Sequence, residues 1–377
     1  MLQRFLVKSL FAATILAAGP ALAEVKLGVG TALTGSNASM GLQVKNGVEQ
    51  AVEDINAKGG INGEKIAVTY GDDRSDPKEA ISVGEKFITD GTKFVVGHLT
   101  STATIAASKE YADNNILLIS SSATNPTFTD QGLWNTFRTA GRDDQQGQYA
   151  GEYILQNYKG KKVAIVHDKG SYGKGLADET KKTLNAGGLT EALYDGVNAG
   201  EKDYSALVSR LKSLNVDVIY FGGYYSEGGL ILRQMRDQGL TNTVMIGGDG
   251  LYNDELGQIA GDGVVGTLMT FTSDPRKNPN AKSVVDALAK KSIDSSGFTL
   301  YSYAAIQVIA QAADEAKSTE PKKVAETIRS GKTFNTVIGP ISYDSKGDLT
   351  KAGYVMYEWK KDADGKLSYS EKTAMSQ

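Results

Sequence analysis

Short apolar runs alternate with segments of helical periodicity along almost the whole chain, and this alternation most constrains the fold. Residues 25–30 form the first apolar run, and residues 42–58 then place apolar side chains at helical spacing. Strands and helices that alternate in this way predict βαβ units with parallel sheets. The strand candidates are apolar almost throughout, as expected where helices cover both faces of a sheet. We therefore predict an α/β protein.

The alternation occurs twice, with a break near residues 140–144. Apolar strand candidates before and after this break are residues 25–30, 65–70, 94–97, 116–120, 162–166, 216–221, 243–246 and 354–359. A length of 377 residues also suggests two domains. The pattern predicts two doubly wound parallel-sheet lobes of similar build.

The first 23 residues have the pattern of a secretory signal peptide. A basic start with Arg4 and Lys8 precedes an apolar stretch, a Gly19-Pro20 break and a small-residue site at 21–23. The apolar stretch is too short and too poorly flanked to span a bilayer. The alternative is a buried N-terminal helix. We expect cleavage after Ala23 and export to the periplasm, which argues against chemistry that needs cytoplasmic ATP or NAD.

Composition excludes several classes of function. The chain has no cysteine and two histidines, so most nucleophile–base constellations and His-rich metal sites cannot be built. The formal net charge of −3 shows no basic bias toward nucleic acid. We expect neither an enzyme nor a cofactor or metal. His98 and His167 are interpreted as hydrogen-bonded structural residues, and the pairs 72–73 and 143–144 as solvated or capping carboxylates.

The ends of the predicted strands indicate where a ligand would bind. In open parallel sheets, ligands lie beyond the carboxyl ends of the strands. In the first half these ends carry hydroxyls and helix starts, which suit a carboxylate; in the second half they carry tyrosines and a carboxylate, which suit an ammonium and an apolar body. A zwitterion with an apolar side chain matches both. Serine and threonine before a helix often serve only as helix caps, so each of these hydroxyls is either a ligand-binding group or a simple cap.

Distinct motifs are spread over the whole mature chain. They include residues 33–35, 52–63, 72–77, 95–99, 122–126, 138–141, 167–169, 199–207, 221–225, 336–340 and 346–349. Together these motifs resemble periplasmic leucine/isoleucine/valine-binding proteins. The resemblance implies the type I periplasmic binding protein fold, in which two α/β lobes are joined by three crossings and close on the ligand by a hinge.

By this resemblance, the crossings fall near residues 139–143, 270–273 and 350–354. Lobe 1 then takes residues 24–142 and 272–351, and lobe 2 takes residues 143–271 and 352–377. The family delivers amino acids to an ABC permease in the inner membrane, so we expect a monomeric solute-binding protein with an amino-acid ligand. The permease-docking surface is not assignable from the sequence.

The resemblance also implies a set of ligand-binding residues. Lobe 1 holds the ligand carboxylate through hydroxyl and backbone groups, lobe 2 holds the ammonium, and aromatic or apolar residues close the pocket. The residues on the carboxylate side are Ser101, Ser122, Ala123 and Thr124. The residues on the ammonium side are Tyr224 and Asp249, and those that close the pocket are Tyr172, Phe298 and Met40.

Two departures from the family pattern leave the exact ligand open. Ser75 and Thr100 stand where relatives have a cysteine pair, and Asp249 stands where enterobacterial members carry glutamate. Together with Met40, at a position that is often aromatic, Asp249 leaves three ligand classes open: branched-chain amino acids, a wider set of neutral amino acids, and γ-aminobutyrate. A ligand sensor that uses the same fold is a further alternative.

Overall fold

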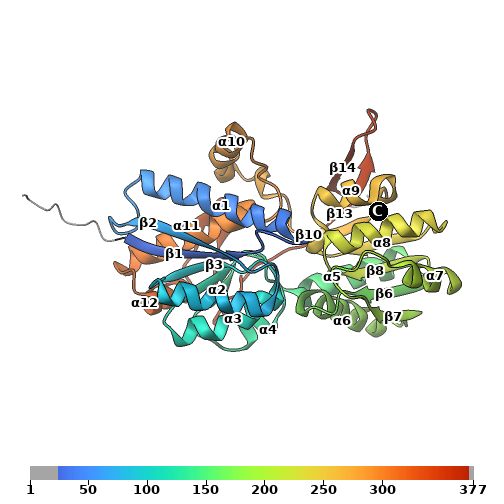
Figure 1. The fold of residues 1–377 in the computed structure, drawn as a ribbon, viewed down its shortest axis with the longest axis horizontal. Coiled ribbons are helices and arrows are strands. Elements are labelled where there is room, and N and C mark those ends of the chain that lie inside the picture. The colour runs from blue at the N-terminus through green and yellow to red at the C-terminus, as the bar shows by residue number, and fades with distance from the viewer. Residues whose placement is uncertain (1–23, 373–377) are drawn as a thin grey trace, which may run out of the picture.

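The computed structural model describes residues 24–372, which form two α/β lobes that lie next to each other along the long axis (Figure 1). The predicted signal peptide, residues 1–23, lies outside the described residues. Each lobe is built around its own sheet, one of five strands and one of seven. Within residues 24–372, no helix is both long and apolar enough to cross a membrane.

The five-stranded sheet is parallel throughout, in the order β2-β1-β3-β4-β5. Its strands are β1 (Glu24–Thr31), β2 (Lys65–Asp72), β3 (Phe94–Gly97), β4 (Leu117–Ser120) and β5 (Thr136–Arg138). The helices of this lobe are α1 (Ala38–Ala57), α2 (Pro77–Thr89), α3 (Ser101–Asp113), α4 (Thr127–Asp130), α11 (Thr299–Ala316) and α12 (Pro321–Ile328). A small hairpin of β11 (Phe334–Thr336) and β12 (Gly339–Ile341) follows α12.

The seven-stranded sheet has the order β14-β13-β10-β9-β8-β6-β7. Its strands are β6 (Val163–His167), β7 (Leu193–Gly196), β8 (Val218–Gly222), β9 (Val244–Gly247), β10 (Leu268–Phe271), β13 (Val355–Lys361) and β14 (Leu367–Glu371). Its main helices are α5 (Asp143–Asn157), α6 (Ser171–Ala186), α7 (Ser205–Ser213), α8 (Tyr225–Asp237) and α9 (Glu255–Ala260), with the short helix η1 (Asp249–Leu251) after β9. Helix α10 (Lys282–Lys290) lies between β10 and α11 in the chain.

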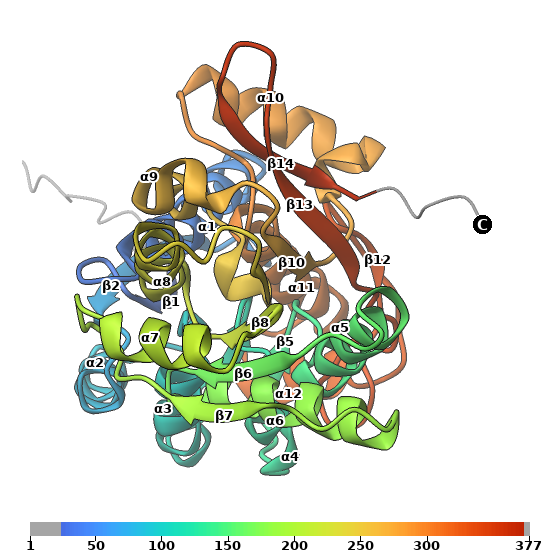
Figure 2. The same cartoon turned by 90° about the vertical axis from the view of Figure 1, so that its right-hand side faces the viewer.

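The α/β class and the parallel sheets are as predicted, but the second sheet is not wholly parallel. Strands β13 and β14 pair antiparallel at one edge, opposite β7 at the other (Figure 2). The prediction missed β10, a four-residue buried run, and the β11–β12 hairpin. It also missed β5, β7 and β14, because these three strands are short or carry as many polar as apolar residues. Their pairing partners, and not an apolar run of their own, hold them in the sheet.

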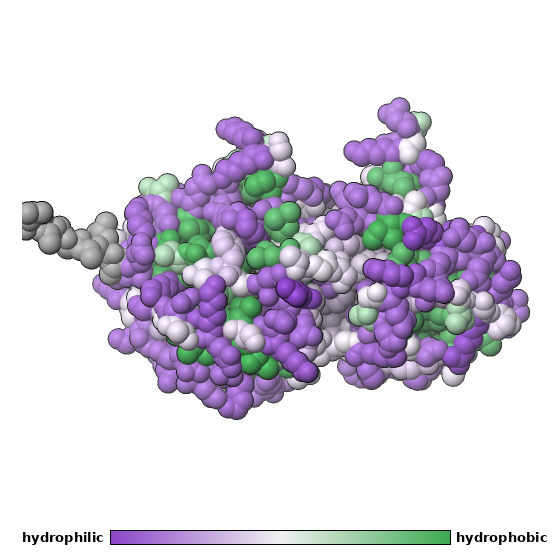
Figure 3. All heavy atoms as spheres, in the orientation of Figure 1, coloured by the Kyte–Doolittle hydropathy of each residue, from purple (hydrophilic) through white to green (hydrophobic). Residues whose placement is uncertain are grey.

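The chain passes between the two sheets three times. It leaves the first sheet after β5 and enters the second lobe at α5, returns after β10, and crosses again between β12 and β13. The crossings expected near residues 139–143, 270–273 and 350–354, and the lobe boundaries drawn from them, stay predictions. Polar side chains cover most of the face seen in Figure 3, which is hollowed between the lobes.

Helix α1 packs closely on α11, and this contact depends on a glycine. A Cβ atom on Gly47 would lie 2.0 Å from the backbone oxygen of Thr299 and 3.0 Å from the Cβ of Ser302. Close-packed interiors do not absorb such an overlap without a shift of the backbone. Gly47 therefore sets the distance between the two helices that cover one face of the first sheet.

Replacing Gly47 with alanine is expected to lower the free energy of unfolding by about 1–3 kcal/mol, because α1 and α11 must move apart. Urea denaturation followed by circular dichroism measures this change. Gly353→Ala is the matched control, since no atom lies within 4 Å of a Cβ placed there. Equal stability of the two variants would show that the α1–α11 contact is not tight.

Candidate functional site

The carboxyl ends of the two sheets meet across a cleft, where several hydrogen bonds join the lobes. The backbone N–H of Ser171 at the start of α6 donates to the hydroxyl of Thr102 on α3 at 3.0 Å, and the side-chain amide of Asn125 donates to the carbonyl of Ser171 at 2.6 Å. Asn253 also donates to the Ser39 hydroxyl on α1 at 3.2 Å. The structure thus holds the lobes in contact around the predicted site.

A small cavity lies where the three connections pass between the lobes. It brings together several hydroxyls, the Asp249 carboxylate and several aromatic rings. Its walls are Thr124, Ala140, Gly141, Asp249, Phe271, Thr272, Phe298, Tyr301 and Tyr354. Three of the predicted site residues, Thr124, Asp249 and Phe298, therefore line one space. Its volume is about 10 Å³ in this arrangement, so its walls must move apart to admit an amino acid, because small-molecule sites are typically about 300–1,000 Å³.

Asp249 is buried at the start of η1 and lacks a basic partner. The Tyr172 hydroxyl donates to its Oδ1 at 2.6 Å, and the same hydroxyl accepts the backbone N–H of Gly250 at 2.8 Å. Burial raises the pKa of Asp249 to about 6, although the hydrogen bond from Tyr172 opposes this shift. None of the ion pairs within residues 24–372 includes Asp249. A ligand cation would fit here.

The predicted tyrosines lie together beside this cavity. The rings of Tyr172 and Tyr224 have centroids 5.1 Å apart, and both line a second, more open hollow between the lobes. Thr100 and Thr102 contribute to the lobe-1 side of this hollow, and Asp168 to the lobe-2 side. Burial raises the pKa of Asp168 to about 7, and its Oδ1 accepts the N–H of Gly170 at 2.8 Å.

The four predicted carboxylate-binding residues of lobe 1 differ in what they can still bind. The Ser101 hydroxyl accepts the N–H of Asn125 at 3.2 Å, and the Ser122 hydroxyl donates to the carbonyl of Leu99 at 2.7 Å. The Ala123 N–H donates to the Ser120 hydroxyl at 2.9 Å. The Thr124 hydroxyl is buried, and its hydrogen bonding lowers the pKa of Asp143. The Ser101 hydroxyl only accepts, so it keeps its O–H to donate to a ligand.

Met40, the remaining predicted residue, lies wholly buried on α1 and belongs to the hydrophobic core. It lines neither the cavity nor the open hollow. The structure therefore does not bring Met40 together with the other predicted residues.

A buried arginine that the sequence analysis did not single out positions the lobe-1 loop. Arg138 on β5 donates to the carbonyls of Ala123 at 2.7 Å and Asn125 at 3.1 Å. Its Nε lies 2.6 Å from Asp348, whose other oxygen is 2.6 Å from Arg142. The ion pair thus fixes the backbone on either side of Thr124.

Asp143 was expected to be solvated or to act as a cap, and this prediction is wrong: it is wholly buried at the first position of α5. Gln146, Gly147 and Ala150 share its buried face. The spacing i, i+3, i+4 and i+7 is helical. Extending the predicted helix two residues toward its N-terminus would therefore have placed Asp143 inside.

Both histidines have structural contacts, as predicted. The Nδ1 of His98 lies 2.6 Å from Asp73 and its Nε2 lies 2.9 Å from the Tyr111 hydroxyl. The Nδ1 of His167 accepts the N–H of Lys169 at 3.1 Å. Within residues 24–372, no group of three or more histidine or acidic side chains is arranged to hold a metal ion.

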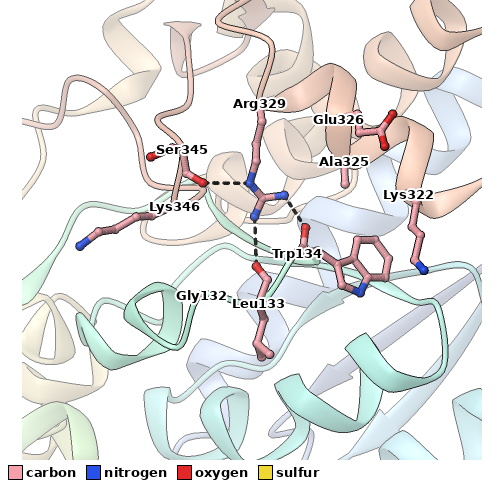
Figure 4. Close-up of a pocket in the computed structure, with 9 residues that line it drawn as sticks. All are labelled: Gly132, Leu133, Trp134, Lys322, Ala325, Glu326, Arg329, Ser345 and Lys346. Atoms are coloured by element: carbon pink, nitrogen blue, oxygen red, sulfur yellow. Dashed lines mark hydrogen bonds between the residues drawn. The ribbon is translucent and has the colours of Figure 1, made fainter.

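A larger groove on lobe 1 contains none of the predicted residues. Trp134, Lys322 and Arg329 line it (Figure 4). The Arg329 guanidinium donates to the carbonyls of Leu133, Trp134 and Ser345, and the Lys322 ammonium lies 5.6 Å from the Trp134 ring centroid. Because the arginine donors bind backbone, this groove offers fewer free polar groups to a ligand than its size suggests.

Comparison with known proteins gives a consistent result. Residues 24–366 match the family described as periplasmic binding protein. The chain belongs to the periplasmic binding protein family. A curated relative, the Leu/Ile/Val-binding protein homolog 1 of Brucella melitensis, is 54% identical over 96% of this chain and 99% of its own length. The Leu/Ile/Val-binding protein BraC3 of Rhizobium johnstonii is 47% identical over 89% of this chain and 92% of its own.

Solved structures agree on the fold of this periplasmic binding protein. The leucine-binding protein LivK of Thermotoga maritima superposes with a TM-score of 0.84 at 29% identity, covering 92% of this chain and 97% of that one. The branched-chain amino acid transporter substrate-binding protein LivJ of Streptococcus pneumoniae, in complex with isoleucine, gives 0.82 at 29% identity, covering 93% and 99%. The protein therefore belongs with substrate-binding proteins and not with enzymes, as the sequence predicts.

Replacing Asp348 with alanine in this periplasmic binding protein is expected to cost about 3–5 kcal/mol of stability, because Arg138 would keep a buried charge without a partner. Thermal and urea denaturation measure the loss. Lys346→Ala breaks the exposed pair of Lys346 with Asp130 and should cost at most about 1 kcal/mol. If both variants lose the same small amount, the buried pair does not hold the loop around Thr124.

Proposed function

We propose that this periplasmic binding protein captures an amino acid with an apolar side chain in the interlobe cavity, as the solute-binding protein of an ABC importer. One observation carries the proposal: the buried Asp249 carboxylate faces an aromatic-walled cavity and has no basic partner within the described residues. An unpaired buried charge is costly, so a cationic ligand group that pairs with it is strongly favoured. The ligand ammonium would supply that charge.

The lobe-1 wall of the cavity would receive the opposite end of the amino acid. Thr124 in the cavity wall and Ser101, whose hydroxyl only accepts, can donate to a carboxylate, and the Arg138 pair fixes the backbone beside Thr124. Ser101 at the first turn of α3 lies near a helix N-terminus, where negative charge is stabilised. Ser122 and Ala123 would shape the loop, since their polar groups already have protein partners.

The aromatic walls would hold the ligand side chain. Phe298 and Phe271 have ring centroids 5.6 Å apart at an interplanar angle of 70°, and Phe271 and Tyr301 are 5.8 Å apart. An apolar side chain that fills this space gains free energy from burial, at roughly 25 cal/mol per Å². Relatives at 47–54% identity are named Leu/Ile/Val-binding proteins, and this supports leucine, isoleucine or valine as the ligand.

Ligand capture would favour closure of the lobes about the three connections. A ligand that touches Thr124 in lobe 1 and Asp249 in lobe 2 binds the closed arrangement better than an open one. Tyr172 supports this step because its hydroxyl holds Asp249 in place. Delivery to an inner-membrane permease, a periplasmic location and a monomeric state complete the proposal, and membership of the family supports the location.

The side chain of Asp249 is shorter than the glutamate of enterobacterial family members, so ligands other than leucine, isoleucine and valine remain candidates. Its bond to Tyr172 fixes the negative charge close to lobe 2, so the distance between the anionic and cationic ends of the ligand decides what fits. A spread of affinities over neutral amino acids, or a preference for γ-aminobutyrate, would assign this protein to the broader group.

Titration calorimetry of protein that has been unfolded and refolded to remove carried-over ligand tests the proposal. Leucine, isoleucine and valine should bind, and Asp249→Asn should weaken leucine by at least about 30-fold, or about 2 kcal/mol, because the ammonium loses its charged partner. Asp254→Asn, an exposed carboxylate of the same lobe, is the control and should bind as the wild type does. Unchanged leucine affinity in Asp249→Asn would contradict the assignment of the cationic end.

A further inference from the structure

The open hollow between the lobes is large enough for a ligand group in this arrangement. Its volume is about 370 Å³, within the range of about 300–1,000 Å³ that is typical of small-molecule sites. It has this volume although the lobes already touch at its edge, where the backbone N–H of Ser171 donates to the hydroxyl of Thr102. The hollow can therefore hold part of a ligand without further opening of the lobes.

Two buried carboxylates form part of the lobe-2 wall of this hollow. Asp168 follows β6 directly and is 6% exposed, and Glu227 in the first turn of α8 is 3% exposed. Asp168 accepts the N–H of Gly170 at 2.8 Å, while Glu227 accepts the N–H of Gly200 at 2.9 Å and the hydroxyl of Ser226 at 2.6 Å. All these donors are neutral, and none of the ion pairs within residues 24–372 includes either acid. Buried carboxylates without a cation are costly, so this wall favours a positively charged group.

The lobe-1 side of the hollow carries an unused hydrogen-bond acceptor. Asn37, which precedes α1, is 5% exposed and lines the hollow. Its side-chain amide donates to the Ser75 hydroxyl at 3.1 Å, whereas its Oδ1 is buried and has no hydrogen-bond partner. Buried acceptors are rarely left unpaired in native proteins. Independently of the two acids, Asn37 thus indicates a ligand group that donates hydrogen bonds.

The basic side chain at the rim of the hollow does not neutralise these acids. Arg74 lines the hollow from lobe 1, but its side chain is 66% exposed and its Nε lies 3.9 Å from Asp72. It forms no ion pair with Asp168 or Glu227, although the lobes are already in contact here. Asp76, which also lines the hollow and caps α2, adds a further negative charge. The acids of the hollow therefore outnumber its one basic side chain.

The remaining walls favour an organic cation over a metal ion. The rings of Tyr172 and Tyr224 lie 5.1 Å apart beside the hollow, and aromatic faces attract ammonium and guanidinium groups and pack against their alkyl stems. Within the described residues, no group of three or more histidine or acidic side chains is arranged to hold a metal. Burial raises the pKa of Asp168 to about 7, and the charge of Glu227 contributes to this shift. A cation beside both acids would favour their charged forms.

We propose that the open hollow is a second subsite, which binds the ammonium or guanidinium group at the end of the side chain of a basic amino acid. Tyr172 joins the two sites, because it lines the hollow and its hydroxyl donates to Asp249. The inference rests on the proposed function and extends the ligands to lysine, ornithine and arginine. Their α-ammonium would pair with Asp249, and their second cation with Asp168 and Glu227. No covalent bond changes in this step.

Lysine and norleucine form a matched pair of ligands, because lysine is norleucine with an ammonium group on its last carbon. Titration calorimetry at pH 7 with refolded protein should show that the wild type binds lysine at least as tightly as norleucine. Asp168→Asn should lower the ratio of lysine to norleucine affinity by at least about tenfold, because the ammonium loses a charged partner. The asparagine keeps an oxygen that can accept the Gly170 N–H. Glu201→Gln, which removes an exposed charge beside Gly200, is the control and should keep the wild-type ratio.

Glu227→Gln provides a second test, since glutamine can still accept the Gly200 N–H. It should lower the same ratio, and melting temperatures of both ligand-free variants show whether they fold. Binding of leucine and norleucine without lysine by the wild type would overturn the inference and leave the proposed function intact. A lysine to norleucine ratio that both folded variants keep would overturn it as well. Absence of any amino-acid binding by the wild type would instead overturn the proposed function.

Discussion

The burial of Asp249 and Asp143 at the junction of the two lobes is the constraint on which the account of the site depends. Both carboxylates are buried, and neither has a basic side chain as its partner within the described residues. The fold would be more stable with neutral groups at these positions, since unpaired buried charges are costly. A ligand cation would offset that cost, and on the proposed function this makes the junction selective for an ammonium group.

The architecture places these charges where motion and binding can be coupled. Asp143 begins α5, directly after the first connection, and Asp249 follows β9 at the carboxyl end of the second sheet. The cavity that Asp249 lines is walled by residues of all three connections, namely Gly141, Thr272 and Tyr354. A ligand in this cavity therefore touches the segments about which the lobes would move, and its contacts favour the arrangement in which both lobes reach it.

Much of this fold could be predicted from the sequence, because an apolar run such as Val163–His167 is typical of a buried parallel strand. Strand β14, with alternating polar residues, and β7, with one fully buried residue, carry no such signal, because partner strands hold them in place. In the site, the strand ends predicted an edge that suits a zwitterion, and the family resemblance implied Thr124, Tyr172 and Asp249. Asp143 was missed because the predicted helix began two residues too late, so its place on the buried face with Gln146, Gly147 and Ala150 did not show.

The measurement that tests the central claim most directly is a crystal structure of the mature protein with leucine. The account predicts leucine in the interlobe cavity, with its ammonium within about 3 Å of the Asp249 carboxylate and its carboxylate near the Thr124 hydroxyl. Leucine bound with its carboxylate toward Asp249, or bound in the groove beside Trp134 with the interlobe cavity unoccupied, would contradict the account.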